Sequence, residues 1–393
     1  MLSRINTAYS SLASPDSDPR PPDLFAASPP KFTAGATNMG RNKSHFRTKH
    51  IEGSTALGDY VTTVHLKSEA GAEASVLTLG ARVLDFRFSH GPNRLLSFDT
   101  LSAIEADPAC VCVAIGRVAN RTRAGKLTRY PEIDAAAHLQ LNDGPNHIHG
   151  GVNNFSKCPF TIREQTENSV ELFLYSPDGG QGYPSSMEFI VRYELTGDAQ
   201  LDVTFITKNV GSQSTVSNIT LHPYFDLSGE GGKVKDSALS YKMHAPNCSR
   251  YLELDGENIP TGTIASVKGT RFDFTEERTI DDGASPFSGY DNFFVASTTT
   301  PPEEVISSLA TFKYERGESH GVQLEVLSNQ PGFQMYTANG YDGREEGGFE
   351  QYGSVAIEPS LLIDGGNQES FPTIELAQDE SRMQRIVYKL SEW

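Results

Sequence analysis

The chain has 393 residues, a net charge of −17 at pH 7 and 37% hydrophobic residues. No stretch approaches the ~20 apolar residues that a membrane-spanning helix needs. The acidic balance also argues against nucleic acid and against anionic substrates as the main partner. The composition therefore predicts no membrane partner and favours a neutral small molecule as the ligand.

The first 50 residues differ in composition from the rest. Residues 1–30 are rich in Ser, Pro, Ala and Asp and contain no apolar core of a secretory signal. Because such a segment cannot bury enough apolar surface to fold, we predict a disordered extension over residues 1–50. Arg4 and Arg20 fit a transit peptide, whereas Asp16, Asp18 and Asp23 do not. We therefore expect a cytoplasmic protein, with organellar targeting by the extension as the open alternative.

From about residue 55 onward, short runs rich in Val, Thr, Ile, Phe and Tyr alternate with turn residues. Runs of strand length and partial apolar alternation lie at 61–66, 75–79, 83–88, 170–175, 187–195, 201–209, 216–221, 322–327 and 334–338. No long window keeps a helical apolar period, and 35 Gly and 22 Pro supply many turns. The pattern predicts an all-β protein, with one large sandwich or barrel domain over residues 55–393.

Cys110 and Cys112 alternate in the run 109–113. We expect this run to be a strand with both thiols buried on one face, which fits a reducing compartment. No second cysteine pair stands at the spacing of a zinc site, so we predict no metal. Motifs for phosphate binding, dinucleotide binding and a serine nucleophile are also absent, so no cofactor is expected.

His147 and His149 lie in the segment NHIHGG at 146–151. If the segment is extended, alternation puts both rings on the same side. The spacing also suits a metal, but no third ligand stands nearby in sequence. The glycine pair indicates a tight turn at the rim of a pocket. The alternative is one packed histidine and one surface histidine.

His222 ends the apolar run 216–221 and precedes Pro223, which interrupts strand pairing. A half-buried imidazole with a pKa near neutrality can donate or accept a proton. The alternative is a core histidine bonded to a backbone carbonyl. Glu358 lies in the otherwise small and apolar run 354–358. Burial would raise its pKa toward that of a useful base, whereas an edge-strand glutamate would face water.

Two further polar residues are candidates for binding hydroxyl groups. Asp291 follows a Gly-Tyr pair, where it could hold a pair of sugar hydroxyls or cap a turn. Arg121 follows an apolar run, where its forked donors suit hydroxyls or a surface salt bridge.

The segments GRVANR (116–121), NHIHGG (146–151) and HPYFDL (222–227) together resemble the aldose 1-epimerases, or galactose mutarotases. The segments 182–184, 289–291, 330–336 and 358–367 continue the match in the order of that family. The resemblance covers roughly residues 55–390. It implies a large antiparallel β-sandwich, the galactose mutarotase-like supersandwich.

The resemblance also implies roles for individual residues. Glu358 matches the general base and His222 the general acid. The positions that match sugar-binding residues are Asn120, Arg121, His149, Asp291 and Gln330. His149 is chosen over His147 because it directly precedes the glycine pair. The choice of Gln330 depends on there being no insertion before Glu358.

The implied activity is the interconversion of the α and β anomers of a free aldohexose such as glucose or galactose, without a cofactor or metal. The alternatives are an enzyme that acts on hexose 6-phosphates and a catalytically silent carbohydrate-binding protein of the same fold. We expect a monosaccharide as the partner and a monomer or weak dimer as the assembly.

Three departures from the family pattern lie beside the matched motifs. Leu221 and Asp226 stand where asparagine is common, and 359–360 (Pro-Ser) replaces Thr-Gln. They bear on substrate preference more than on the chemistry. The N-terminal extension has no counterpart in the family core.

Overall fold

The computed structural model describes residues 48–317, 319–344 and 346–393. Most of the predicted N-terminal extension, residues 1–47, lies outside the described residues. None of the helices in the described ranges has the length and apolar character needed to cross a membrane.

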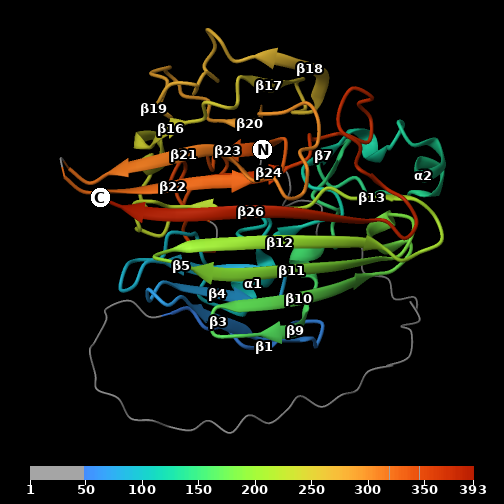
Figure 1. The fold of residues 1–393 in the computed structure, drawn as a ribbon, viewed down its shortest axis with the longest axis horizontal. Helices are drawn as coiled ribbons and strands as arrows, with labels where there is room; N and C mark the ends of the chain where they lie inside the picture. The colour runs from blue at the N-terminus through green and yellow to red at the C-terminus, as the bar shows by residue number, and fades with distance from the viewer. Residues whose placement is uncertain (1–47, 318, 345) are drawn as a thin grey trace, which may run out of the picture. The chain divides into compact units, whose positions relative to one another are not determined.

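The largest element is a nine-stranded antiparallel sheet, whose long strands lie side by side in Figure 1. Its strands in spatial order are β19 (Arg278–Thr279), β16 (Lys242–His244), β21 (Ser307–Glu315), β22 (Gly321–Ser328), β26 (Ser381–Glu392), β12 (Gln200–Asn209), β11 (Met187–Thr196), β10 (Ser169–Ser176) and β9 (Thr161–Gln165). Every pair in it is antiparallel.

A six-stranded antiparallel sheet forms the second large layer. Its order is β15 (Tyr224–Phe225), β24 (Val355–Ser360), β23 (Gly332–Tyr336), β20 (Asp291–Val295), β17 (Arg250–Leu254) and β18 (Pro260–Ser266). Ring contacts between Phe225 and Tyr388 join this sheet to β26 of the larger one. The two sheets share one apolar core, which is the arrangement of a β-sandwich.

The remaining elements are short. A three-stranded sheet contains β3 (Thr63–Lys67), β4 (Glu73–Leu77) and β5 (Arg82–Arg87). Four pairs are β1 (Gly53–Ser54) with β2 (Tyr60–Val61), β6 (Ala114–Ile115) with β14 (Thr220–Leu221), β7 (Arg121–Thr122) with β8 (His147–Ile148), and β13 (Thr215–Val216) with β25 (Glu375–Leu376). The helices are α1 (Leu101–Ala106), α2 (Pro131–Ala136), η2 (Arg123–Gly125), η3 (Phe155–Lys157), η4 (Gly180–Gly182) and η5 (Ser237–Ser240).

Side-chain alternation explains why these segments form a sandwich. In β11 every second residue is buried, namely Met187, Phe189, Val191, Tyr193 and Leu195. Each such side chain contributes roughly 1.5–3 kcal/mol when it leaves water. β24 is buried along its whole length, because both of its faces are covered. A polar side chain on that strand therefore lies inside the protein.

The all-β prediction and the sandwich architecture are confirmed. Each predicted run overlaps at least one observed strand, although 216–221 is divided between β13 and β14. The prediction did not include β26, the longest strand, in which charged residues interrupt the apolar ones.

The predicted strand at 109–113 is wrong. Cys110 and Cys112 have positive φ angles of 55° and 56°, so this run is a turn. The Asp107 carboxylate accepts hydrogen bonds from the amides of Ala109 and Val111, which holds the turn in place. Both thiols are buried, as expected.

The described chain is packed from residue 48, seven residues before the predicted domain start. Ile51 is buried, and its backbone amide and carbonyl both bond to the Thr63 hydroxyl. The Arg87 guanidinium donates to the hydroxyl of Thr48. Residues 48–54 therefore belong with the sandwich rather than with the extension.

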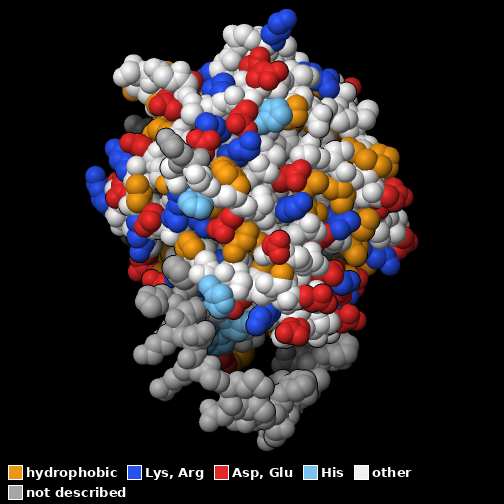
Figure 2. All heavy atoms as spheres, turned by 60° about the vertical axis from the view of Figure 1, so that its left-hand side comes forward, with side chains coloured by type: hydrophobic (Ala, Val, Ile, Leu, Met, Phe, Trp, Pro, Cys, Tyr) orange, Lys and Arg blue, Asp and Glu red, His pale blue; other side chains and the backbone are white. Residues whose placement is uncertain are grey.

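Acidic and basic side chains are interspersed on the face drawn in Figure 2. Apolar side chains on this face are scattered among them rather than gathered in one large patch. A face with this mixture carries no extended basic surface of the kind that binds a phosphate backbone.

Candidate active site

His222 and Glu358 are brought together from segments 136 residues apart by the β15–β24 pairing. Nε2 of His222 lies 3.2 Å from Oε1 of Glu358, and the side chains are only 6% and 3% exposed. Glu358 is on a central strand of the six-stranded sheet, so it is not an edge-strand residue facing water. The structure thus places one imidazole and one carboxylate in contact inside the protein.

Backbone bonds on both sides hold His222 in position. Its amide donates to the carbonyl of Val113, and its carbonyl accepts from the amide of Cys112, both at 2.9 Å. The ring packs against that of Tyr224, with 5.0 Å between centroids. Nδ1 of the ring is buried and has no hydrogen-bond partner among the described residues. His222 is therefore not a core histidine whose ring is bonded to a backbone carbonyl.

Burial changes the proton affinity of both groups. It raises the pKa of Glu358 well above its ordinary value; the nearby Asp291 adds to this shift and Arg121 opposes it. Burial also lowers the pKa of His222 to about 4. Both shifts favour the uncharged forms, because an isolated charge is poorly solvated in the interior. A carboxylic acid with a raised pKa and an imidazole with a lowered one are suited to exchanging protons with a bound hydroxyl group.

Asp291 and Gln334 lie beside Glu358 on adjacent strands. Gln334 is directly opposite Glu358 in the β23–β24 register, which puts both side chains on the same face. Nε2 of Gln334 donates to Oδ1 of Asp291 at 2.6 Å. Oε1 of Gln334 is buried without a partner in the described part of the chain. The amide thus presents an unused acceptor beside the carboxylate of Glu358.

Gln330 lies apart from this cluster. It precedes β23, and its Nε2 donates to Oδ1 of the neighbouring Asn329. Gln330 stands before the first residue of β23 and is not paired with β24, whereas Gln334 is. Gln330 was predicted from its spacing to Glu358 along the chain. The β23–β24 register instead places Gln334 beside Glu358 and Asp291. The signal for Gln334 was present, because it is the polar residue within the otherwise apolar segment 332–336.

Arg121 and Asn120 form the opposite side of the cluster. Asn120 has a φ of 61°, and its side-chain oxygen accepts from the amide of Arg121. Nε of Arg121 donates to Oδ2 of Asp143 at 2.8 Å, and Nη1 donates to Oδ2 of Asp291 at 3.4 Å. The Arg121 side chain is only 14% exposed, so it is a half-buried bridge rather than a surface salt bridge.

His149 and His147 have different surroundings. The segment is not extended through both histidines, as the alternation argument requires, because β8 ends at Ile148 and His149 has a φ of 52°. The His149 ring lies 5.2 Å from that of His222, and its Nδ1 accepts from the amide of Asn120. Since that amide can only donate, a neutral His149 carries its proton on Nε2. Burial and the nearby His222 lower the pKa of His149, which favours this neutral form.

His147 is a packed histidine. Its two ring nitrogens contact the hydroxyl of Tyr183 at 2.6 Å and the carbonyl of Gln140 at 2.7 Å. The turn after the histidines depends on glycine: a Cβ at Gly150 would lie 2.0 Å from the carbonyl oxygen of Gly116. The close approach of these two backbone segments joins the Asn120 turn to the His149 turn.

The departures from the family pattern are built into the surrounding structure. Asp226 is fully buried, and its carboxylate accepts from Ser228, Gly232 and Tyr241, so it braces a loop. Leu221 is a buried residue of β14 paired with Ala114.

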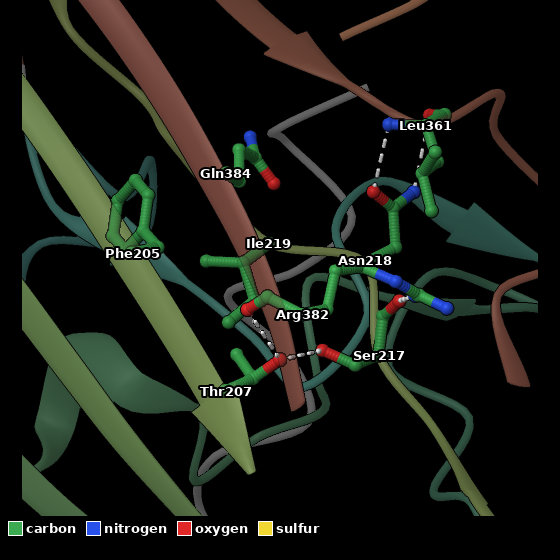
Figure 3. A pocket seen from close by; sticks show the side chains of 8 residues that line it. All are labelled: Phe205, Thr207, Ser217, Asn218, Ile219, Leu361, Arg382 and Gln384. Carbon is green, nitrogen blue, oxygen red and sulfur yellow. Dashed lines mark hydrogen bonds between the residues drawn. The ribbon is translucent and has the colours of Figure 1, made fainter. Parts of the chain in front are cut away.

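A small cavity lies elsewhere, and its lining includes Asn218, Leu361 and Arg382 (Figure 3). It has a volume of about 10 Å³, room for one water molecule, and its lining contains none of the candidate site residues. In the described ranges, no three His, Cys, Asp or Glu side chains are arranged to hold a metal ion.

Comparisons with known proteins agree with this geometry. The model of the aldose 1-epimerase family matches residues 62–389. A galactose mutarotase of Bos taurus is 32% identical over 322 residues, which is 80% of this chain and 88% of the relative. An aldose 1-epimerase of Escherichia coli is 29% identical over 320 residues, which is 78% of this chain and 88% of the relative.

Solved structures show the same fold. The galactose 1-epimerase of Lactobacillus acidophilus superposes with a TM-score of 0.72 at 25% identity, over 88% of this chain and 99% of the other. An aldose epimerase homologue from C. elegans also has a TM-score of 0.72, at 23% identity, over 84% of this chain and 99% of the other. The chain belongs to the aldose 1-epimerase family.

Proposed function

We propose that the protein is an aldose 1-epimerase, an isomerase that interconverts the α and β anomers of a free aldohexose such as glucose or galactose. The observation that carries this proposal is the buried contact of 3.2 Å between His222 and Glu358. The names of the relatives, galactose mutarotase and aldose 1-epimerase, support it.

The proposed chemistry follows from the substrate. A cyclic aldose is a hemiacetal, in which the ring oxygen and the hydroxyl oxygen are bonded to the same carbon, C1. Opening the ring removes the proton of the C1 hydroxyl and adds a proton to the ring oxygen as the bond from C1 to that oxygen breaks. Because the two oxygens share one carbon, a base and an acid that touch each other can reach both. Glu358 as base and His222 as acid meet this requirement.

The open aldehyde then rotates about the bond between C1 and C2. The former ring hydroxyl attacks the other face of the carbonyl, His222 takes back its proton, and Glu358 returns a proton to the new C1 hydroxyl. No atom is gained or lost, and no redox step occurs. Productive catalysis needs Glu358 ionised and His222 protonated, so sugar hydroxyls that replace lost solvation should favour this state of the pair.

We assign substrate positioning to Asn120, Arg121, His149 and Asp291, and we replace Gln330 by Gln334. Nε2 of His149 offers a donor, the Asp291 carboxylate offers acceptors, and the free Oε1 of Gln334 offers another acceptor. Hydrogen-bond donors and acceptors around His222 and Glu358 fit a ligand rich in hydroxyls, because each hydroxyl both donates and accepts. Holding the ring in this way keeps C1 beside the acid and the base.

Neither alternative function has an observation in its favour. A hexose 6-phosphate needs free cations, whereas Nε and Nη1 of Arg121 are both bonded to carboxylates. A silent sugar-binding protein would have no need for a buried acid and base in contact.

We also propose a monomer or weak dimer in the cytoplasm, with a functional sandwich domain that needs no contribution from residues 1–47. Four free cysteines support a reducing compartment. The net charge of −17 makes copies of the chain repel each other, which supports a small assembly.

Polarimetry of freshly dissolved α-galactose or α-glucose tests the proposed activity. The wild-type protein should speed the drift to the equilibrium rotation in proportion to its concentration. Glu358→Gln should show no acceleration while still binding the sugar. Wild-type rates in this variant would remove Glu358 from the mechanism, and an inactive wild-type protein would refute the function.

A further inference from the structure

Arg121, which we assign to sugar binding, is bonded to two carboxylates. Nε donates to Asp143 at 2.8 Å, and Nη1 donates to Asp291 at 3.4 Å. Both carboxylates raise the pKa of the guanidinium, although burial opposes this. The positive charge of Arg121 is therefore more than balanced by its protein neighbours before any sugar binds.

Asp143 differs from Asp291 in its position. Its side chain is 34% exposed, against 26% for Asp291, and it belongs to a loop rather than to the central sheet. A tight turn holds it, because Asp143 and Asn146 exchange two backbone hydrogen bonds of 3.0 Å. Its Oδ1 has no hydrogen bond within the described chain, so one oxygen of a well-held carboxylate is free.

Further acidic groups lie around this turn. Nδ2 of Asn146 donates to Glu257, and Arg123 is paired with Asp255 at 2.8 Å. The two arginines of this region, Arg121 and Arg123, are therefore paired with three carboxylates, namely Asp143, Asp255 and Asp291. The paired carboxylates outnumber the guanidinium groups by one, and Glu257, bonded to Asn146, adds a further negative charge at the turn.

We infer that Asp143 is a specificity-determining residue that biases the site against anionic sugars. This inference rests on the function proposed above. A neutral hydroxyl can donate to the free oxygen of Asp143, whereas a uronate or phosphate group meets a like charge and no uncommitted guanidinium. A protonated 2-amino sugar is tolerated, because its positive charge is attracted by the carboxylate of Asp143. The preferred substrate class is the neutral or cationic aldohexose.

Asp143→Asn tests this inference with little change of shape. The asparagine oxygen can still accept from Nε of Arg121, but one negative charge is removed. The initial rates of anomer interconversion are measured for galactose, galacturonic acid and galactosamine, the last below the pKa of its amine. The ratio of kcat/KM for galacturonate to that for galactose should rise roughly tenfold, the size expected for a partly exposed charge. The ratio for galactosamine should fall.

Asp379→Asn is the matched control, because Asp379 is exposed and its positive φ of 61° suits asparagine. This variant should leave both ratios unchanged. If Asp143→Asn changes kcat/KM for all three sugars by one common factor, Asp143 only positions Arg121 and the inference is overturned. High salt should reduce the discrimination of the wild-type protein, because screening weakens exposed charges.

Calorimetric binding of the same three sugars separates this inference from the proposed function. A wild-type protein that prefers galactose in binding, and loses that preference in Asp143→Asn, supports the inference even if no turnover occurs. Turnover of galactose with equal binding of galactose and galacturonate would support the function and overturn the inference.

Discussion

Replacing Glu358 by glutamine is expected to stop catalysis and, at the same time, to stabilise the folded protein. Glutamine has nearly the same shape as glutamate and carries no charge, so the packing of β24 should be kept. The side chain is 3% exposed, and its near neighbour is the imidazole of His222 at 3.2 Å. The variant therefore lacks a buried carboxylate whose negative charge, when ionised, is poorly balanced by its surroundings.

The size of the stabilisation depends on pH in a defined way. Burial raises the pKa of Glu358 above its ordinary value of 4.5. The folded protein thus retains a proton that the unfolded chain releases. The stabilising contribution is fully present below the unfolded pKa and is lost as pH rises through the folded pKa, at about 1.4 kcal/mol per pH unit. Glutamine does not titrate. The free energy of unfolding of Glu358→Gln should therefore exceed that of the wild type by about 1.4 kcal/mol more for each pH unit in this range.

Urea unfolding of the two proteins at several values between about pH 5 and pH 8 measures this difference. The m-values should agree, which would show that the compactness of both states is unchanged. Asp379→Asn removes an exposed carboxylate and should show no such trend. The activity of Glu358→Gln should fall by at least the roughly 10²–10⁴-fold that a general acid or base usually contributes, so polarimetry should detect no acceleration above the spontaneous drift.

Two results would refute this reasoning. One is a variant that is less stable than the wild type by more than about 1 kcal/mol at every pH, which would mean that the carboxylate is well compensated. The other is a stability difference that does not change with pH, which would mean that the pKa of Glu358 is not raised.

Four further predictions follow from the geometry. The folded pKa of His222 is lowered to about 4, so its contribution to the free energy of unfolding is present above the unfolded value of 6.5 and is lost as pH falls through 4. The wild-type protein should therefore lose stability on acidification. In urea titrations, His222→Asn should lose roughly 3 kcal/mol less over the same pH range. The same variant should lose far more activity than His147→Asn, and the opposite order in polarimetry would reverse our choice of histidines. Gln334→Ala should raise KM at least tenfold in steady-state kinetics, whereas an equal effect of Gln330→Ala would restore the assignment from sequence spacing. Removing residues 1–54 should lower the free energy of unfolding by about 2 kcal/mol relative to a protein that begins at residue 48, because the segment 48–54 buries an isoleucine; equal stability would put the domain start at 55.

The sequence by itself determined the fold class and most of the strands. A period of two residues is a local property, and burying every second side chain of 187–195 or 201–209 is possible only in a sheet. The motifs around Asn120, His149, His222, Asp291 and Glu358 are also local, so they could be recognised in chain order. Spacing predicted Gln330, whereas our proposal of Gln334 rests on the sheet register, in which Gln334 stands opposite Glu358.

Only the tertiary structure decided which of these groups touch. The contact of His222 with Glu358 arises from the β15–β24 pairing, and the link of Arg121 to Asp143 and Asp291 joins three segments that are distant in sequence. The positive φ angles at Cys112 and His149 change the side-chain directions that strand alternation predicts, since a left-handed residue ends an extended run. The pKa shifts follow from burial, which depends on what the rest of the chain covers. Long-range register and burial are properties of the whole fold, and no local pattern in the sequence contains them.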